Sequence, residues 1–164
     1  MNRIQGRAHV YGDNIDTDRI IPGKYTKTLN LDDLAAHVLE DLDPAFSKTV
    51  QPGDILVAGE NFGCGSSREQ APVAIKMAGV AVVVASYFAR IFYRNAINIG
   101  LPVVEIGPHS IQPGNRLEVD LTGGMVRDLT AGHEYRATKM PYVMVEILAA
   151  GGLAPYLRQH GNYP

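Results

Sequence analysis

The sequence predicts an α/β domain in which helices flank a mixed sheet, and three observations lead to this class. Residues 55–106 alternate short apolar runs with stretches of helical periodicity, in the order strand, helix, strand, helix, strand. From Arg116 onward, alternating apolar and polar residues with paired glycines predict antiparallel strands instead. The length of 164 residues suits one domain over 1–164, without an internal repeat or a clear linker.

The first part of the chain predicts a strand, a loop and a helix. Residues 3–11 form the predicted strand, and residues 12–25 (GDNIDTDRIIPGKY), named the acidic loop here, are rich in turn formers and acids. Apolar residues then recur at helical spacing from Leu31 to Leu42, which predicts an amphipathic helix. Asn30 is its predicted N-cap, since a side-chain oxygen at that position accepts a backbone N–H.

The central part predicts strands and helices in alternation. In turn, these are a strand at 55–58, a helix at 71–79, a strand at 80–86, a helix at 88–99 and a strand at 101–106. The strand at 80–86 is a continuous β-branched run, which is typical of a strand buried on both faces. Gly79 and Gly100 are the predicted stops of the two helices, and Ser86 is the predicted cap of the second.

The last part predicts a β-rich segment and one more helix. Residues 116–121 (RLEVDL) alternate, Gly123-Gly124 offers a hairpin turn, and residues 134–137 (EYRA) add a strand. Pro141 opens a predicted helix that continues through Leu148. The remaining residues, 151–164, are polar and are predicted to be irregular.

Composition argues against several classes of function. A formal net charge of −2 gives no electrostatic reason to expect nucleic acid or an anionic membrane as a partner. No apolar run approaches the ~20 residues that span a bilayer, and residues 1–3 lead into mixed polar sequence, which argues against a signal peptide. The only cysteine, Cys64, excludes an intrachain disulfide and fits a reducing, cytoplasmic location. The five histidines are scattered without metal-ligand spacing, so no metal site is predicted.

Residues 59–69 (GENFGCGSSRE), named the glycine-serine loop here, lie between a predicted buried strand and a predicted helix. Ligands gather at the carboxyl ends of strands in open α/β sheets, where the N–H groups of helix N-termini favour an anion. Gly63 and Gly65 let the backbone turn with positive φ and approach a ligand closely. Ser66 and Ser67 add hydroxyls, and Arg68 adds a planar fork that suits a carboxylate or phosphate. The loop therefore predicts a site for a small, multiply charged anion.

The same residues allow a plainer interpretation. Gly63 and Gly65 could only form a tight turn, while Ser67 caps a helix and Arg68 is solvated. The loop lacks the spacing of a Walker phosphate loop and of a nucleophile elbow. Cys64 has no histidine near it in sequence to support a nucleophilic role, so a small buried thiol is the alternative.

Three segments carry a resemblance to a known family: residues 11–25 (YGDNIDTDRIIPGKY), 59–72 (GENFGCGSSREQAP) and 85–102 (ASYFARIFYRNAINIGLP). Together they resemble the small-subunit family of 3-isopropylmalate dehydratases, within the aconitase superfamily, and the resemblance runs over essentially the whole chain. It implies a swivelling β/β/α domain made as a separate polypeptide. It also implies that this chain binds no cofactor and that a larger subunit carries a 4Fe–4S cluster.

The resemblance further implies residue roles. Ser66 is the base that removes and returns a carbon-bound proton, and Ser67 and Arg68 hold a substrate carboxylate. Asp18 matches the active-site aspartate of the superfamily, with a turn or capping aspartate as the alternative. Because an unperturbed serine is a very poor base, its alkoxide needs stabilisation, which the loop N–H groups and Arg68 could provide.

Residues 23–28 (GKYTKT), named the discriminator segment here, correspond to the substrate-specificity segment of that family. Isopropylmalate enzymes tend to have apolar residues there and homoaconitases an arginine, whereas this chain has Thr26 and Lys27. Lys27 could bind a distal carboxylate or point into water. Gln70 stands where a histidine is common in the family, and since an amide does not titrate, it receives no proton-transfer role.

The predicted function is that of the small subunit of a hydro-lyase, which isomerises a small di- or tricarboxylate by dehydration and rehydration. Isopropylmalate, in leucine biosynthesis, is the first choice of substrate, and a homoaconitase or related malate-type dehydratase is the alternative within this class. A stand-alone anion-binding or regulatory module is the alternative from another class, with a serine hydrolase as a more remote one. The expected partner is a large cluster-bearing subunit, and self-association of the isolated chain stays open.

Overall fold

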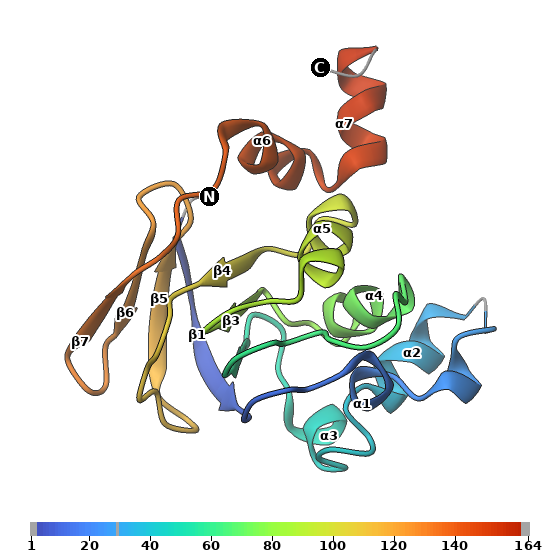
Figure 1. Ribbon diagram of the computed structural model, residues 1–164, viewed down its shortest axis with the longest axis horizontal. Coiled ribbons are helices and arrows are strands. Elements are labelled where there is room, and N and C mark those ends of the chain that lie inside the picture. Colours follow the sequence, from blue (N-terminus) through green and yellow to red (C-terminus); the bar gives the residue numbers. More distant parts are fainter. Residues whose placement is uncertain (1–2, 29, 162–164) are drawn as a thin grey trace.

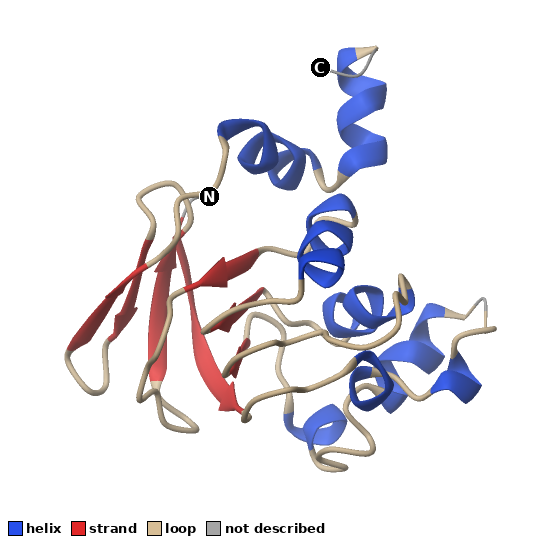
Figure 2. Ribbon diagram, in the orientation of Figure 1, coloured by secondary structure: helices blue, strands red, loops and turns tan. Residues whose placement is uncertain are grey.

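A computed structural model describes residues 3–28 and 30–161, and its strands form one seven-stranded sheet in the order β4-β3-β2-β1-β5-β6-β7. The strands are β1 (Arg3–Val10), β2 (Ile55–Ala58), β3 (Val82–Ala85), β4 (Val103–Glu105), β5 (Arg116–Asp120), β6 (Met125–Asp128) and β7 (His133–Arg136). The helices are α1 (Thr17–Ile20), the 3₁₀ helix η1 (Gly23–Tyr25), α2 (Leu31–His37), α3 (Phe46–Thr49), α4 (Gln70–Met77), α5 (Arg90–Asn98), α6 (Tyr142–Ala150) and α7 (Leu153–His160). Figure 2 shows the strands gathered on one side and the helices on the other.

The two halves of the sheet meet at β1. This strand pairs in parallel with β2, where Ala8 lies opposite Ile55, and antiparallel with β5, where Gly6 lies opposite Leu117. Strands β2, β3 and β4 continue the parallel half, while β5, β6 and β7 form an antiparallel meander. The mixed sheet with flanking helices confirms the predicted fold class (Figure 1).

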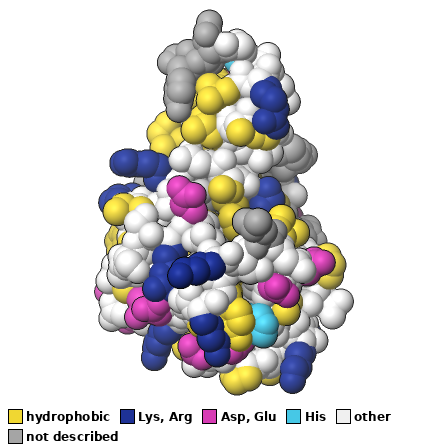
Figure 3. Space-filling view, turned by 90° about the vertical axis from the view of Figure 1, so that its right-hand side faces the viewer, with side chains coloured by type: hydrophobic (Ala, Val, Ile, Leu, Met, Phe, Trp, Pro, Cys, Tyr) yellow, Lys and Arg dark blue, Asp and Glu magenta, His cyan; other side chains and the backbone are white. Residues whose placement is uncertain are grey.

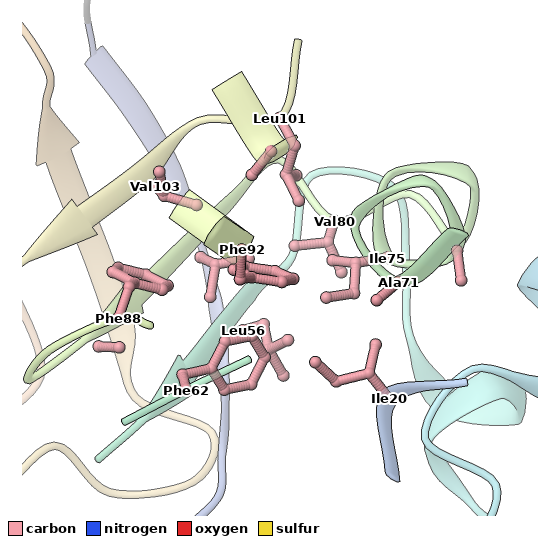
Figure 4. Close-up of a cluster of buried hydrophobic side chains, with 14 of the residues drawn as sticks. Ile20, Leu56, Phe62, Ala71, Ile75, Val80, Phe88, Phe92, Leu101 and Val103 are labelled. Carbon is pink, nitrogen blue, oxygen red and sulfur yellow. The ribbon is translucent and has the colours of Figure 1, made fainter. Parts of the chain in front are cut away.

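Side chains of the parallel strands alternate between two cores. Leu56 and Val83 belong to a large cluster shared with the helices, part of which Figure 4 shows. Ile55 and Val82, their neighbours in sequence, belong to a second cluster shared with Leu117 of the antiparallel half. The central strands are therefore covered by helices on one face and by antiparallel strands on the other, which explains their uninterrupted apolar sequence.

Several predicted boundaries are confirmed. Asn30 caps α2, because its side-chain oxygen accepts a hydrogen bond of 2.9 Å from the backbone N–H of Asp32. Gly79 and Gly100 follow α4 and α5 with φ of 102° and 83°, so each supplies the left-handed conformation that ends a helix. Pro141 immediately precedes α6, as predicted.

Two predictions about helix ends are wrong. Helix α2 ends at His37 and does not reach Leu42, because Val38 is extended and Leu39 has φ of 57°. Leu39 is nevertheless fully buried, so the apolar spacing continued through a turn that faces the same core. Ser86 does not cap α5; the N-cap is Ala89, whose backbone N–H is held by the Phe62 carbonyl at 2.9 Å.

The predicted irregular tail is also wrong over its described part, since α7 occupies Leu153–His160. Tyr156 is buried in the helix-side cluster, with Leu153 and Leu157 packed against it, so these residues anchor the helix, and its polar residues come last, at 158–160. Residues 162–164 of that prediction, and residues 1–2 of the signal-peptide prediction, lie outside the described residues. Strand β6 and helix α3 were not among the predicted elements.

The surface on the helical side carries positive and negative side chains interspersed with apolar ones (Figure 3). Helices α6 and α7 lie at the end of the molecule beyond α5 (Figure 1). Over residues 3–28 and 30–161, the model contains no helix with the length and apolar character of a membrane span.

Candidate active site

The acidic loop and the glycine-serine loop run side by side beyond the ends of β1 and β2. The backbone N–H of Thr17 donates to the Cys64 carbonyl at 2.9 Å, and the N–H of Gly63 donates to the Ile15 carbonyl at 2.8 Å. Because β1 and β2 are parallel, both loops leave the sheet at the same edge. The structure therefore brings together the two motifs that the sequence singled out.

Gly63 sits where no other residue fits without rearrangement. Its φ is 83°, and a Cβ added there would lie 2.3 Å from Cγ of Phe92 on α5. Phe92 in turn packs edge-on against Phe62, with ring centroids 5.1 Å apart, as Figure 4 shows. Gly65 also has a positive φ, 91°. The tight turn of the plainer interpretation is therefore present. The same turn brings the loop into close contact with α5.

A pocket of about 310 Å³ opens beside this turn. Its lining includes the exposed Ser66 and Ser67, the guanidinium-bearing Arg68 and Arg90, and Asn95. The volume lies at the lower end of the range of small-molecule sites, ~300–1,000 Å³. The hydroxyls and guanidinium groups among these lining residues suit a small carboxylate.

Arg68 is held in place by the acidic loop. Its Nη1 lies 2.6 Å from Oδ1 of Asp18 and donates to the Ile21 carbonyl at 3.3 Å. The side chain of Arg68 is only 23% exposed, whereas that of Asp18 is 66% exposed. The alternative of a solvated Arg68 is therefore wrong. Both contacts use Nη1, and the fork has further donors on Nη2 and Nε for a carboxylate.

Two capping roles that were considered for site residues belong to other residues. Asp16, rather than Asp18, is the N-cap of α1, and its Oδ1 accepts from the N–H of Arg19 at 2.9 Å. Glu69, rather than Ser67, occupies the N-cap position of α4, without a side-chain capping bond. Asp18 and Ser67 are both exposed; Ser67 lines the pocket, whereas Asp18 is not one of the described residues that line it and reaches the site through Arg68.

Lys27 and Gln70 have different positions relative to the pocket. Lys27 is exposed, and among the described residues it is not one of those that line the pocket. Gln70 lies at the start of α4 and donates from Nε2 to the Thr26 carbonyl at 3.0 Å. The sequence analysis gave Gln70 no proton-transfer role, and a single sequence holds no signal for a contact between residues 44 positions apart.

Arg90 is a pocket residue that the sequence analysis did not identify. Its Nη2 donates to the Phe88 carbonyl at 2.9 Å and pairs with the carboxylate of Glu105. Glu105 is buried at the end of β4 and also accepts from the Phe88 N–H at 3.1 Å. Burial and the nearby Glu105 carboxylate raise the pKa of Tyr93, against the opposing charge of Arg90, so the Tyr93 hydroxyl stays protonated. An acid within the apolar run at 101–106 was the one available signal for this pair.

Comparison with known proteins places these features in a family. Residues 42–108 match the family model described as the aconitase C-terminal domain. The 3-isopropylmalate dehydratase small subunit of Caldicellulosiruptor bescii is 56% identical over 157 residues, which cover 94% of this chain and 95% of that protein. This chain belongs to the family of 3-isopropylmalate dehydratase small subunits. The family resemblance drawn from the sequence is therefore confirmed.

Two further proteins are similar to this chain over most of its length. The methanogen homoaconitase small subunit of Methanothermobacter thermautotrophicus is 56% identical over 150 residues, covering 92% of this chain and 88% of that one. A crystal structure of 3-isopropylmalate dehydratase from Methanocaldococcus jannaschii superposes with a TM-score of 0.93 at 46% identity, covering 97% of this chain and 95% of that chain. The resemblance therefore extends to proteins named for two different substrates.

The residues of this small-subunit family member do not fit an iron–sulfur cluster. Over the two described ranges, no three His, Cys, Asp or Glu side chains come together as a possible metal site. Cys64 is the only cysteine of the chain, whereas such clusters are held by several thiolates.

Proposed function

We propose that this chain is the small subunit of a 3-isopropylmalate dehydratase, a hydro-lyase that interconverts 2-isopropylmalate and 3-isopropylmalate in leucine biosynthesis. The observation that carries the proposal is a pocket with two serine hydroxyls and a fixed guanidinium in a member of this small-subunit family. Relatives with that name cover nearly the full length of the chain, which supports the same activity here.

In this proposal Arg68 binds a substrate carboxylate through the part of its fork that Asp18 does not engage. Two parallel N–H donors recognise a carboxylate with both strength and direction. Ser67 adds a hydroxyl donor, and the backbone N–H groups of the glycine-serine loop add further dipoles. The substrate is thereby held with its carbon-bound proton toward Ser66.

Ser66 acts as the base that removes that proton and later returns it. A serine alkoxide is costly in water, so this role depends on groups that stabilise negative charge in the pocket. The Arg68 guanidinium and the loop dipoles are already fixed before substrate binds, so they need no reorganisation during the reaction. Asp18 acts on this step through Arg68, whose Nη1 it holds at 2.6 Å.

A 4Fe–4S cluster would supply a Lewis acid for the hydroxyl group of the substrate. Since the residues of this chain do not fit such a cluster, the proposal assigns the cluster to a separate large subunit. The small di- or tricarboxylate substrate is then shared between the two chains. This chain contributes carboxylate recognition and proton transfer.

Reconstitution tests this proposal directly. The purified chain is expected to lack both iron–sulfur absorbance and hydro-lyase activity, and addition of a cluster-bearing large subunit is expected to produce turnover of isopropylmalate. Robust isomerase activity from this chain alone would contradict the two-subunit proposal. Ligand binding that survives while no large subunit confers activity would instead favour a stand-alone anion-binding module.

Homoaconitate is the second candidate substrate, and two observations favour it. A relative named for homoaconitase is as similar as the isopropylmalate relatives, and Lys27 places a cation in the discriminator segment. The alternative is that the long Lys27 stem lines an apolar wall while its ammonium stays in water. Isopropylmalate remains the first choice, because the neighbours Thr26 and Thr28 are small and neutral.

Comparison of the two substrates in the wild type and in Lys27→Leu separates these candidates. A Lys27 contact with a distal carboxylate is a charge-assisted hydrogen bond worth about 1.5–3 kcal/mol, or roughly tenfold to a hundredfold in kcat/KM. If the wild type prefers homoaconitate and Lys27→Leu loses that preference, the chain is a homoaconitase subunit. Unchanged preference for isopropylmalate in both proteins supports the first choice.

A further inference from the structure

Gln70 makes a contact that joins the candidate catalytic loop to the discriminator segment. It is the first residue of α4 and lies two positions after Arg68. Its side-chain Nε2 donates to the backbone carbonyl of Thr26 at 3.0 Å. Thr26 directs its own N–H and hydroxyl back to the Gly23 carbonyl, at 3.2 and 2.8 Å, so its carbonyl is the group that reaches outward to α4.

The other end of the same segment is fixed by Arg68. A Cβ built on Gly23 would lie 3.3 Å from Nη1 of Arg68, so the backbone of Gly23 packs directly against the guanidinium. The same Nη1 donates to the Ile21 carbonyl. Arg68 and Gln70 therefore hold both ends of the stretch 21–26 against the point where the glycine-serine loop becomes α4.

Other contacts of the segment lead to α2. Tyr25 stacks on His37 with ring centroids 3.9 Å apart, and the Thr28 hydroxyl donates to Asp33 at 3.2 Å. These contacts hold the segment against α2. The Gln70 hydrogen bond fixes the segment to the start of α4, which closely follows the site residues Ser66, Ser67 and Arg68. Lys27 follows Thr26, so the position of Lys27 depends on where the Thr26 carbonyl is held.

We propose that Gln70 is a positioning residue for substrate discrimination: its amide N–H sets the register of the discriminator segment relative to Arg68 and so determines which substrate side group fits. This inference rests on the proposed function. The role requires a donor, because the partner is a backbone carbonyl, and it requires no titration. A displaced segment changes the fit of the substrate side group and leaves the groups that transfer the proton in place, so the effect is expected in KM and in the substrate ratio rather than in kcat.

The first test compares isopropylmalate and homoaconitate as substrates of the assembled two-subunit enzyme. Gln70→Leu keeps the size of the side chain but removes the donor. Its KM for the preferred substrate is expected to rise about threefold to tenfold, the range for one lost hydrogen bond, with kcat within about twofold. The ratio of kcat/KM between the two substrates is expected to change by at least about threefold.

Gln70→His provides the conservative rescue, since a ring N–H can donate to the same carbonyl. It is expected to keep both KM and the substrate ratio within about twofold of wild type, in line with a retained hydrogen bond. Gln159→Leu, the same chemical change at an exposed position of α7, is the matched control and is expected to alter neither value. An equal loss with both substrates, or a loss confined to kcat, would overturn the proposal.

The second test needs no activity. Hydrogen exchange of the isolated chain is expected to speed up at the amides of Thr26 and Thr28 in Gln70→Leu, while the α2 amides change little. Unchanged exchange at those two amides would overturn the positioning role. If the wild type turned over neither substrate, the proposed function would fail, whereas this measurement would still decide whether Gln70 positions the segment.

Discussion

Ser66 has an exposed hydroxyl whose chemistry depends on its surroundings. Its backbone carbonyl accepts from the Thr17 hydroxyl at 2.8 Å, which fixes the loop beneath the side chain. Ser66→Ala removes the proposed base and leaves the carboxylate contacts of Ser67 and Arg68. We expect kcat of the assembled enzyme to fall by about 10²–10⁴, the usual contribution of a general base, with KM changed much less.

Ser67→Ala is the matched control for this prediction. It removes the neighbouring hydroxyl, to which we assign binding, so KM is expected to change more than kcat. Steady-state kinetics of both variants, with the same large subunit, make the comparison. A near-normal kcat for Ser66→Ala would contradict its assignment as the base and favour the interpretation of the loop as a plain turn.

Arg68 tests whether the pocket needs a guanidinium or only a positive charge. Arg68→Lys keeps the charge but loses the planar fork, and it also breaks the geometry that joins Nη1 to Asp18 and Ile21. We expect a loss of about 1.5–3 kcal/mol in kcat/KM, as for a hydrogen bond to a charged group, with KM clearly raised. Arg158→Lys, an exposed position on α7, is the same change as a control. Equal kinetics for both variants would remove Arg68 from the site.

The sequence could identify the site residues that lie within one motif, and it could not identify those brought in by folding. Ser66, Ser67 and Arg68 are consecutive, and their chemistry is evident from their side chains. Gln70 and Arg90 take part through partners that are remote in sequence, the Thr26 carbonyl and the Glu105 carboxylate. A single sequence gives no indication of which distant positions meet. The Gln70 contact depends on the pairing of β1 with β2, and the Arg90 contact depends on the pairing of β3 with β4.

Among the elements, the turn at Gly63 connects the site to α5 through sterics alone. Gly63→Ala would place a methyl group 2.3 Å from Cγ of Phe92 and would require φ of 83° in a residue with a Cβ. Positive φ and overpacking each cost about 1–3 kcal/mol. We expect the free energy of unfolding to fall by about 2–4 kcal/mol on that basis, as measured by urea titration.

Gly12→Ala is the control for this prediction. A Cβ at Gly12 would meet nothing within 4 Å, and its φ is not positive. The change is therefore expected to leave the free energy of unfolding within about 0.5 kcal/mol of wild type. Similar effects of the two substitutions would show that the Phe92 contact does not constrain the turn.

Asp54 joins neighbouring elements and makes stability depend on pH. It precedes β2 and contacts two residues of β1, His9 at 2.7 Å and Arg7 at 3.3 Å. Burial alone would raise the pKa of Asp54, but the His9 hydrogen bond, the Gln51 N–H and the Arg7 charge outweigh it and hold the pKa below its ordinary value. Ionised Asp54 therefore stabilises the fold.

The direction of the pH effect follows from this lowered pKa. The stabilisation is fully present above the unfolded pKa of about 3.9, and it is lost as pH falls through the folded value. We expect acid unfolding of the wild type to include a loss below about pH 4 that Asp54→Asn lacks. Urea titrations at a series of pH values measure it, and parallel profiles for the two proteins down to acid unfolding would contradict the assignment.

Element boundaries were predictable where one residue forces the backbone, and unpredictable where tertiary packing decides. Gly79 and Gly100 end helices through a conformation that glycine adopts easily, so their stops are evident from sequence. Helix α2 ends early because Leu39 has φ of 57°, which no helix residue adopts. Leu39 is still buried, so the apolar residues keep a helical spacing in the sequence although the backbone is no longer helical. Helix α7 forms because Tyr156 reaches the core and Leu153 and Leu157 pack against the same cluster.

For the whole molecule, the arrangement of the sheet predicts one cooperative unit over the described chain. Strand β1 hydrogen-bonds to both halves of the sheet, and the central strands bury opposite faces in two different cores. Loss of the antiparallel half would expose the Ile55 and Val82 face of the parallel half. Each half therefore depends on the other for the burial of its apolar surface.

Val126→Ala tests this dependence from the antiparallel half of the sheet, whose strands β5, β6 and β7 contribute no residue to the lining of the pocket. Val126 lies on β6, is fully buried, and contacts the core behind the parallel strands. Its truncation is expected to cost about 1.5–3 kcal/mol of unfolding free energy. If the chain unfolds as one unit, hydrogen exchange at the slowest amides of β2 and β3 should show the same loss of protection as those of β6, because all of them open only by global unfolding.

Leu129→Ala, at a site 49% exposed just after β6, is the control and is expected to change the free energy of unfolding by less than about 0.5 kcal/mol. Destabilisation confined to β5, β6 and β7, with β2 and β3 unaffected, would mean that the two halves unfold separately and that residues 1–164 are not a single domain.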